Sequence, residues 1–299
     1  MPQPFPVAFV YAGAPGDEGW VDAQEIAREA LEARLDWVHT TVRSGVTAAA
    51  AAETLDRLAS DGWRLIIVAD PALRAAAEAA VAVPTWTTFL LVGDRESVSV
   101  ASRDGALETA RYLAGRCAGA RAVADSVQVI GIVARGDGPR EEGFVDAATR
   151  GIREVCPACR VLVRGIGPDT GPGEDVTAIS ALFDAGAGVV FAATGGETAL
   201  SAVPQGRWLV TRALAGPCEA APDRCLTATS WQWAREYESA VKRINDGSWE
   251  QKRALLGPDS GAIGLLGFMD REAPPPGIPP GAVADIRERF DRMKHGGVR

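Results

Sequence analysis

The sequence has few residues of the kinds that catalytic sites and metal centres use. Only two of its 299 residues are histidine, His39 in a strand-like segment and His295 near the carboxyl terminus, and neither is placed as a general base. The chain has no Gly-x-Ser-x-Gly elbow, no Gly-Lys-Ser/Thr phosphate loop and no His-x-x-x-His pair. We therefore predict a protein that is not an enzyme and that holds no cofactor and no metal.

The sequence also lacks an excess of positive charge and a long apolar run. It has 31 Lys and Arg against 39 Asp and Glu, a net charge of −8, so it offers no broad basic face for phosphates. No run approaches the roughly 18 apolar residues that a membrane span requires. These absences predict no nucleic-acid partner and no direct insertion into a membrane.

Cysteine is scarce, with five residues, of which four form two close pairs. The pairs are Cys156/Cys159 and Cys218/Cys225, and Cys117 is left over. Such pairs can form local disulfides in an oxidising compartment or remain thiols in a reduced protein, and the sequence leaves both open. A four-thiolate zinc site is not expected, because the first pair precedes a predicted strand and Cys218 follows one, which would separate them at opposite ends of a sheet.

What the sequence does contain is an alternation of strand-like and helical segments along almost its whole length. Strands are predicted near residues 7–13, 37–43, 64–69, 87–92, 98–102, 127–133, 160–163, 188–193, 208–210, 226–228 and 261–268. Helices are predicted near 20–35, 48–60, 71–82, around 110–115, 141–155, 176–185, 197–202, 231–245 and 283–294. This alternation is typical of parallel sheets wound with crossover helices, so the predicted fold class is α/β.

The length is comfortable for two domains. We predict an amino-terminal lobe formed by residues 1–103 plus 231–258 and a carboxyl-terminal lobe formed by residues 104–230. Residues 259–299 contain a crossing strand, a proline segment and a last helix, and the sequence assigns them to neither lobe. Consecutive prolines favour extended chain, so the segment 274–280 is predicted to be a strap over the surface.

The loop after the first predicted strand carries Asp17 and Trp20, just before a long helix. Open α/β sheets bind ligands at the carboxyl ends of their strands. There an indole ring offers a flat apolar face, and a carboxylate offers a hydrogen-bond acceptor. The alternative is that Trp20 is only the first core anchor of its helix, and the residues alone leave both interpretations open.

Similar loops follow other predicted strands, at Asp70, Asp94, Arg135 and Thr194, and we expect them all to open toward one cleft between the lobes. The segment Ala-Thr194-Gly195-Gly-Glu197 could present backbone amides to an anion at a helix start, although small residues at such turns are common. Asp104 begins the helix that follows the predicted strand 98–102.

Tryptophan is abundant, with eight residues against three Tyr. Trp20, Trp86, Trp231 and Trp233 all fall at or near the ends of predicted elements, which favours a planar ligand, because a base stacked on an aromatic ring gains about 1–3 kcal/mol. Side chains two residues apart on a helix point to different sides of it. The hypothesis is that Trp233 faces the ligand, and the alternative is that one of Trp231 and Trp233 packs in the core.

Several stretches in order resemble one family. They are Gly16-Asp-x-Gly-Trp20, Ala110-Arg-Tyr-Leu-Ala-Gly115, residues 144–157 with a helix that ends before Cys-Pro, Asp184-Ala-Gly-Ala-Gly188, and residues 226–237. Over nearly the whole chain the sequence is similar to the basic membrane protein family, the substrate-binding proteins of ABC importers whose best understood members bind purine nucleosides. The resemblance implies a type I periplasmic-binding-protein fold, with two Rossmann-like lobes around a hinged cleft.

The resemblance also implies roles for residues. Trp20 stands where the family places a stacking aromatic, Asp17 matches the acid before it, and Trp233 stands where nucleoside-binding members often carry Lys. The chain departs from the family pattern in three places. Val21 replaces a frequent Asn, Arg212 lies near the expected position of an Asp that meets the ribose, and the loop 165–173 lacks the usual aromatic.

We therefore expect a solute-binding protein that captures a purine nucleoside, a nucleobase or a related planar heterocycle by lobe closure and delivers it to the membrane permease of an ABC importer. The predicted ligand-binding residues are Asp17, Trp20, Asp70, Asp104, Thr194, Gly195, Glu197, Arg212 and Trp233. The amino terminus as written leaves no room for an export signal before the strand-like residues 7–11. Either a signal was removed and the protein is periplasmic or extracellular, tethered if it was a lipoprotein, or it is a cytoplasmic small-molecule sensor.

Overall fold

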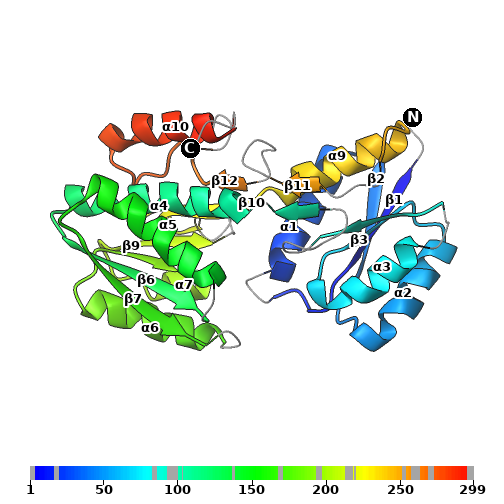
Figure 1. Cartoon of the computed structure of the whole chain (residues 1–299), viewed down its shortest axis with the longest axis horizontal. Helices are drawn as coiled ribbons and strands as arrows, with labels where there is room; N and C mark the ends of the chain where they lie inside the picture. Colours follow the sequence, from blue (N-terminus) through cyan, green and yellow to red (C-terminus); the bar gives the residue numbers. More distant parts are fainter. Residues whose placement is uncertain are drawn as a thin grey trace. The chain divides into compact units, whose positions relative to one another are not determined.

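The computed structural model describes residues 4–16, 20–82, 86–92, 100–102, 104–136, 139–167, 171–192, 197–212, 218, 220–250, 254–256, 263–268 and 273–294. The chain divides into two compact units (Figure 1). Unit 1 is Met1–Asp104 with Gln232–Gly257, and unit 2 is Gly105–Trp231 with Pro258–Arg299. The tail that follows residue 257 therefore belongs with unit 2.

Unit 1 is built on a four-stranded parallel sheet. Its strands are β1 (Phe5–Val10), β2 (Val38–Arg43), β3 (Leu65–Val68) and β4 (Thr88–Leu91), in the order β2-β1-β3-β4. A second, two-stranded parallel sheet pairs β5 (Val100–Ser102) with β11 (Ala254–Leu256). The central strands β1 and β3 are almost fully buried, which explains their near-continuous apolar sequences.

Helices cover both faces of the unit 1 sheet. On one face α2 (Ala48–Ser60), the 3₁₀ turn η1 (Pro71–Leu73) and α3 (Arg74–Val81) pack on Ala8 and Val10 of β1. On the other face, Phe9 of β1 contacts α9 (Trp233–Asn245), which lies beside α1 (Trp20–Arg34). This alternation along β1 is what a strand buried between two layers of helices requires.

Unit 2 contains a six-stranded sheet in the order β12-β10-β9-β8-β6-β7. The strands are β6 (Val129–Arg135), β7 (Arg160–Ile166), β8 (Val189–Ala192), β9 (Trp208–Arg212), β10 (Cys225–Trp231) and β12 (Ile263–Leu265). The pairs are parallel except that β12 runs antiparallel to β10. The α/β class with parallel sheets is thus confirmed.

Two apolar cores lie on the two faces of this sheet. One includes Leu113 of α4 (Asp104–Ala124), Ile152 of α5 (Pro139–Val155) and Phe290 of α10 (Pro280–Lys294). The other includes Leu182 of α6 (Pro172–Asp184) and Leu200 of α7 (Glu197–Ser201). Alternate residues of β8 contribute to one core and then to the other, so both faces of the sheet are buried.

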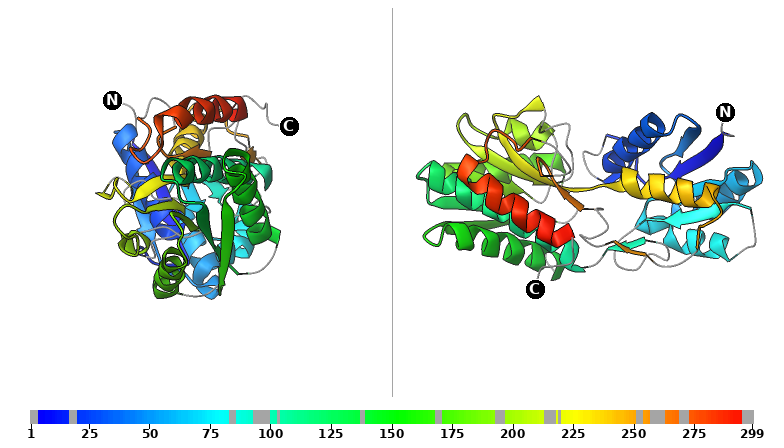
Figure 2. Two further views of the ribbon diagram at one scale, coloured as in Figure 1. Left: turned by 90° about the vertical axis from the view of Figure 1, so that its left-hand side faces the viewer. Right: turned by 90° about the horizontal axis from the view of Figure 1, so that it is seen from above.

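The proline segment is held against unit 2 at several points. Ile278 is buried in the same core as Phe290, and Arg121 of α4 donates a hydrogen bond to the carbonyl of Gly277 at 3.3 Å. A side chain at Gly277 would collide with the ring of Trp208. From there α10 lies across α4, where Arg116 bonds to Asp285 at 3.1 Å (Figure 2). The segment is therefore an anchored connection between the sheet and α10.

The cysteine pairs form two disulfides, Cys156–Cys159 and Cys218–Cys225, and Cys117 is free and buried. The sequence-based reason for keeping the pairs apart was wrong. Cys159 directly precedes β7 and Cys225 begins β10, so both pairs reach the amino-terminal side of the sheet, and they are separated because they belong to the cores on its two faces. Among the described residues, no group of three or more His, Cys, Asp or Glu could hold a metal ion.

Three predicted boundaries need correction. Trp231 was assigned to a helix, but it is the last residue of β10, and α9 begins at Trp233. The helix predicted at 71–82 begins as a 3₁₀ turn, and the Asp70 carboxylate caps this turn by accepting a hydrogen bond from the Ala72 amide at 2.8 Å. The strand predicted at 160–163 continues to Ile166. In the ranges that the structure describes, no helix has both the length and the apolar composition to cross a bilayer.

Candidate ligand-binding site

The carboxyl ends of the unit 1 strands bring several predicted residues together. Trp20 is the first residue of α1 and is half-buried. Its indole N–H donates a hydrogen bond to the carbonyl of Ala69, one residue beyond the end of β3. Asp70 follows directly and caps η1. The hydrogen bond from Trp20 therefore fixes the ring at the edge of the sheet where open α/β folds bind ligands.

Trp20 belongs to an aromatic cluster, which we define as Trp20, Trp233, Tyr237 and Phe9. The rings of Trp20 and Trp233 meet edge to face, with centroids 5.7 Å apart and an interplanar angle of 76°. Trp233 stacks on Tyr237 at 6.3 Å and 18°, and Tyr237 meets Phe9 of β1 at 5.3 Å and 77°. Trp233 is 3% exposed. Within unit 1, Trp233 is thus a buried ring that packs against Trp20, and Trp20 is the more accessible of the two.

A buried polar contact fixes the base of this cluster. Gln24 lies one turn after Trp20 on α1 and is 0% exposed, and its amide oxygen accepts a hydrogen bond from the hydroxyl of Tyr237. Burial raises the pKa of Tyr237 well above its usual value, so the hydroxyl remains a donor. The pair Trp20 and Gln24 on α1 therefore faces the pair Trp233 and Tyr237 on α9. The sequence prediction missed Gln24 and Tyr237, although their four-residue spacing from the two tryptophans could have signalled them.

Tyr11, another residue that the sequence prediction missed, follows the end of β1 and is fully buried. Burial raises the pKa of its hydroxyl, and the nearby Glu25 adds to the effect. Glu25 is in turn paired with Arg28 at 2.9 Å. The hydroxyl of Tyr11 therefore places a polar group in the interior next to the aromatic cluster. The hydroxyls of Tyr11 and Tyr237 are both neutral.

The carboxyl edge of the unit 2 sheet carries a mostly buried ion pair. Arg135, the last residue of β6, donates a hydrogen bond to Asp175 of α6 at 2.5 Å, and its backbone N–H donates to Glu141 at 3.2 Å. Asp175 is 5% exposed. The sequence indicated the loop at Arg135 but not Asp175, whose only signal was an acidic residue in the first turn of a helix.

The other predicted residues divide between the units. Arg212 ends β9 and Glu197 begins α7 in unit 2, and Asp104 begins α4, but the side chains of these three residues are outside the part that the structure describes. Asp17, Asp94, Thr194 and Gly195 lie outside the described residues altogether. Of the nine predicted residues, the structure thus brings Trp20, Asp70 and Trp233 to one edge of unit 1.

The tryptophan count was a poor argument for a planar ligand. Trp37, Trp63 and Trp86 each lie one or two residues before β2, β3 or β4, at the amino ends of the strands. Trp208 is the first residue of β9 in unit 2. These four rings lie at the edge opposite to the one where α/β sheets bind ligands.

Comparison with known proteins shows which kinds of protein this chain resembles. No family model matches the chain. The chain is 26% identical over 271 residues to a purine-binding protein of Brucella abortus, an alignment that covers 88% of this chain and 75% of that protein. It is 25% identical over 261 residues to a protein of Haloferax volcanii named as an ABC transporter glucose-binding protein, with 85% of this chain and 64% of that protein covered.

Its fold matches the solved structure of an ABC-transporter solute-binding protein from Conexibacter woesei, with a TM-score of 0.79, 17% identity and coverage of 99% of this chain and 98% of that one. The fold is therefore that of the periplasmic binding proteins. The chain is thus similar to solute-binding proteins of ABC transporters of the basic membrane protein kind. The proteins it resembles are non-enzymatic solute-binding proteins by their names, and one of them is named for binding purines.

Proposed function

We propose that this solute-binding protein captures a purine nucleoside, a nucleobase or a related planar heterocycle by closure of its two lobes, for uptake by the permease of an ABC importer. The observation that carries the proposal is the ring of Trp20, held by Ala69 and backed by Trp233 at the carboxyl edge of the unit 1 sheet. The similarity to the purine-binding protein of Brucella abortus supports the same ligand class.

The physical argument is that the ring of Trp20 is fixed before the ligand arrives. Its indole N–H is bonded to backbone and its ring meets that of Trp233 edge to face, so little side-chain entropy remains to be lost when a base stacks on it. Stacking on a preorganised ring is worth about 1–3 kcal/mol and tolerates several heterocycles. We propose that Asp17, Asp70 and Asp104 from unit 1 and Thr194, Gly195, Glu197 and Arg212 from unit 2 supply the polar contacts that select among them.

Glucose is the competing ligand, because the Haloferax volcanii relative is named as a glucose-binding protein. A pyranose ring can also pack on an aromatic face, but most of its binding energy comes from hydrogen bonds to hydroxyl groups. The two ligand classes therefore depend differently on Trp20. Removal of the ring should abolish much of the affinity for a purine and less of the affinity for a sugar.

Adenosine, guanosine, adenine, hypoxanthine and glucose should be titrated separately into the full chain, with tryptophan fluorescence and the thermal midpoint as readouts. We expect a purine to quench fluorescence and raise the midpoint. The substitution Trp20→Ala should weaken purine binding about tenfold to a hundredfold, and Trp20→Phe should retain much of it. Unfolding of each variant without ligand separates lost affinity from lost fold. Stabilisation by glucose alone, with no response to any purine, would refute the proposal.

A cellular location outside the cytoplasm, with or without a lipid tether, is part of the same proposal. The two disulfides support it, because such bonds persist in oxidising compartments. Quantification of free thiols in protein isolated from its native cells tests this point. One reactive thiol after denaturation, from Cys117, is the expected result, and five would favour a reduced cytoplasmic protein.

A further inference from the structure

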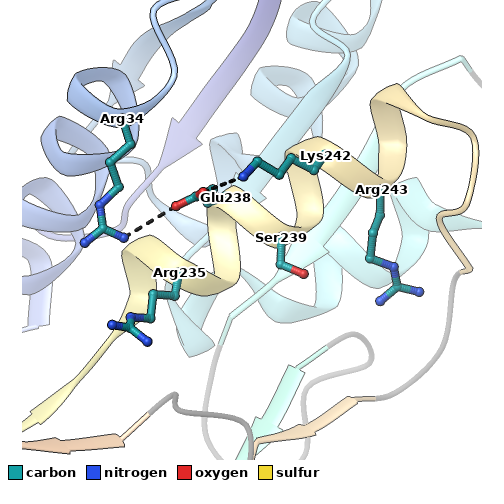
Figure 3. Close-up of a pocket in the computed structure, with 6 residues that line it drawn as sticks. All are labelled: Arg34, Arg235, Glu238, Ser239, Lys242 and Arg243. Atoms are coloured by element: carbon teal, nitrogen blue, oxygen red, sulfur yellow. Dashed lines mark hydrogen bonds and ion pairs between the residues drawn. The ribbon is translucent and has the colours of Figure 1, made fainter. Parts of the chain in front are cut away.

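One surface of unit 1 gathers cations in a chain of negative net charge. A groove of about 590 Å³, which we call the α9 groove, is lined by Arg34, Arg235, Glu238, Ser239, Lys242 and Arg243 (Figure 3). Four of these six side chains are cationic and one is acidic, whereas the whole chain has a net charge of −8. The groove includes none of the residues predicted to bind the transported ligand.

A single carboxylate organises one side of the α9 groove. Glu238 accepts a hydrogen bond from Lys242 at 2.6 Å and pairs with Arg34 of α1 at 3.4 Å (Figure 3). The hydrogen bond from Lys242 lowers the pKa of Glu238, so the carboxylate is ionised at neutral pH. One negative charge is thus shared between two cations, and the side of the groove keeps a positive excess.

The other side of the groove follows one face of the α9 helix. Arg235, Ser239 and Arg243 are spaced four residues apart, and Figure 3 shows their side chains on the same side of the helix. The helical rise separates the two arginines by about 12 Å. The guanidinium of Arg243 lies over the ring of Trp249 at 5.5 Å, which holds this end of the row. Cations spread over this length suit an extended segment with several carboxylates better than one compact anion.

Helix stabilisation explains only part of this arrangement. Lys242 and Arg243 lie in the last turn of α9 and Arg34 in the last turn of α1, where cations interact favourably with the helix dipole. Arg235 lies near the first turn of α9, where the dipole opposes a cation. The helix dipole therefore accounts for Arg34, Lys242 and Arg243 but not for Arg235.

We propose that the α9 groove is a docking surface for an acidic segment of a protein partner, and that this partner is a membrane component of the importer. The acidic chemistry follows from the charge of the groove. The identity of the partner rests on the proposed function, because an importer must recognise its solute-binding protein.

A synthetic peptide of alternating Glu and Gly, labelled with fluorescein, tests the acidic chemistry by anisotropy with the full chain at low ionic strength. The matching Lys-Gly peptide is the control ligand. We expect the acidic peptide alone to bind and its affinity to fall as salt is added. The double substitution Arg235→Glu/Arg243→Glu should weaken binding at least about tenfold, since charge reversal adds repulsion to the lost attraction. Arg235→Gln/Arg243→Gln should give an intermediate loss.

Arg57→Glu is the matched control, because Arg57 is a 70% exposed arginine of α2 that pairs with Glu53 on the same helix. It should leave the affinity for the peptide unchanged. Equal binding of both peptides, or an equal loss in Arg57→Glu, would overturn the proposal. So would binding to phosphatidylglycerol vesicles in place of the peptide, which would indicate a membrane surface instead.

The purine titration is repeated on the same variants to keep the two proposals distinguishable. Loss of peptide binding with unchanged purine binding supports a separate docking surface. If no variant, including the unmodified chain, binds a purine while the peptide result holds, the proposed ligand fails and the acidic docking surface remains.

Discussion

Tryptophan has different roles at the two edges of the unit 1 sheet. At the carboxyl edge, Trp20 and Trp233 contact each other, and Trp20 is bonded to the loop that follows β3. At the amino edge, Trp37, Trp63 and Trp86 precede three successive strands. The residue type is the same at both edges, but the first group joins an aromatic cluster with Tyr237 and Phe9 at the edge where open α/β sheets bind ligands.

The contacts at the amino edge show what those rings do instead. Trp37 meets Phe5, the first residue of β1, edge to face at 5.9 Å, and Trp63 packs at 5.7 Å from His39 of β2. These rings cover the end of the sheet. The comparison teaches that the number of tryptophans says little about a ligand, whereas the edge at which a tryptophan lies and its bonded neighbours say much more.

Among the substitutions that test this comparison, the largest loss of stability is expected from Trp233→Ala. The ring is 3% exposed and fills the space between Trp20 and Tyr237, so its removal should leave a cavity that destabilises unit 1 by about 3–5 kcal/mol. Hydrogen exchange of the α9 amides measures this locally, without assuming that the two units unfold together. Trp233→Phe, which keeps an aromatic ring, should lose markedly less. A loss below about 1 kcal/mol for the alanine variant would mean that the cluster does not depend on this ring.

A smaller effect is expected from Tyr237→Phe, which removes the hydroxyl that donates to Gln24. The amide of Gln24 is fully buried, and its nitrogen has no hydrogen-bond partner within the described residues, so the loss of the Tyr237 hydroxyl should cost about 1–3 kcal/mol.

Replacing both partners gives the control for this prediction. In Gln24→Leu/Tyr237→Phe neither residue 24 nor residue 237 has an unsatisfied polar group, so much of the lost stability should return. A double-mutant cycle measured by urea unfolding gives the coupling free energy between the two side chains. If the double variant loses as much as the two single variants together, the hydrogen bond does not hold the cluster.

The fold could be predicted from the sequence because its signals are local. The helix 48–60 begins after Thr47, whose hydroxyl caps it, and the buried strand Leu65–Val68 is a continuous apolar run before Asp70 and Pro71. The failures were at transitions. Trp231 is apolar and next to a helical pattern, so nothing local indicated that it ends a strand that pairs with residue 263, far along the chain.

The site was only partly predictable, because its members meet through packing. Trp20 stood out by its place after a strand, but its contact with Trp233 depends on α1 and α9 lying side by side, more than 200 residues apart in sequence. The four-residue spacing of Gln24 and Tyr237 from the two tryptophans places them on the same helix faces, but it did not indicate that Gln24 is buried, since a glutamine within a helix is usually exposed. The pairing of Arg135 with Asp175 likewise depends on α6 returning to the end of β6.

The smallest effect is expected from Trp86→Ala, at the other edge. Trp86 is fully exposed, so its ring makes little contact that the fold could lose, and the change in unfolding free energy should stay within about 0.5 kcal/mol. Purine affinity should also be unchanged, because the ring precedes β4 and the proposed ligand-binding loops follow the strands. Parallel titrations of Trp86→Ala and Trp20→Ala with the same purine measure the contrast. A matching loss of affinity in both variants would show that the two edges are not functionally separate, and the argument from strand ends would then fail for this protein.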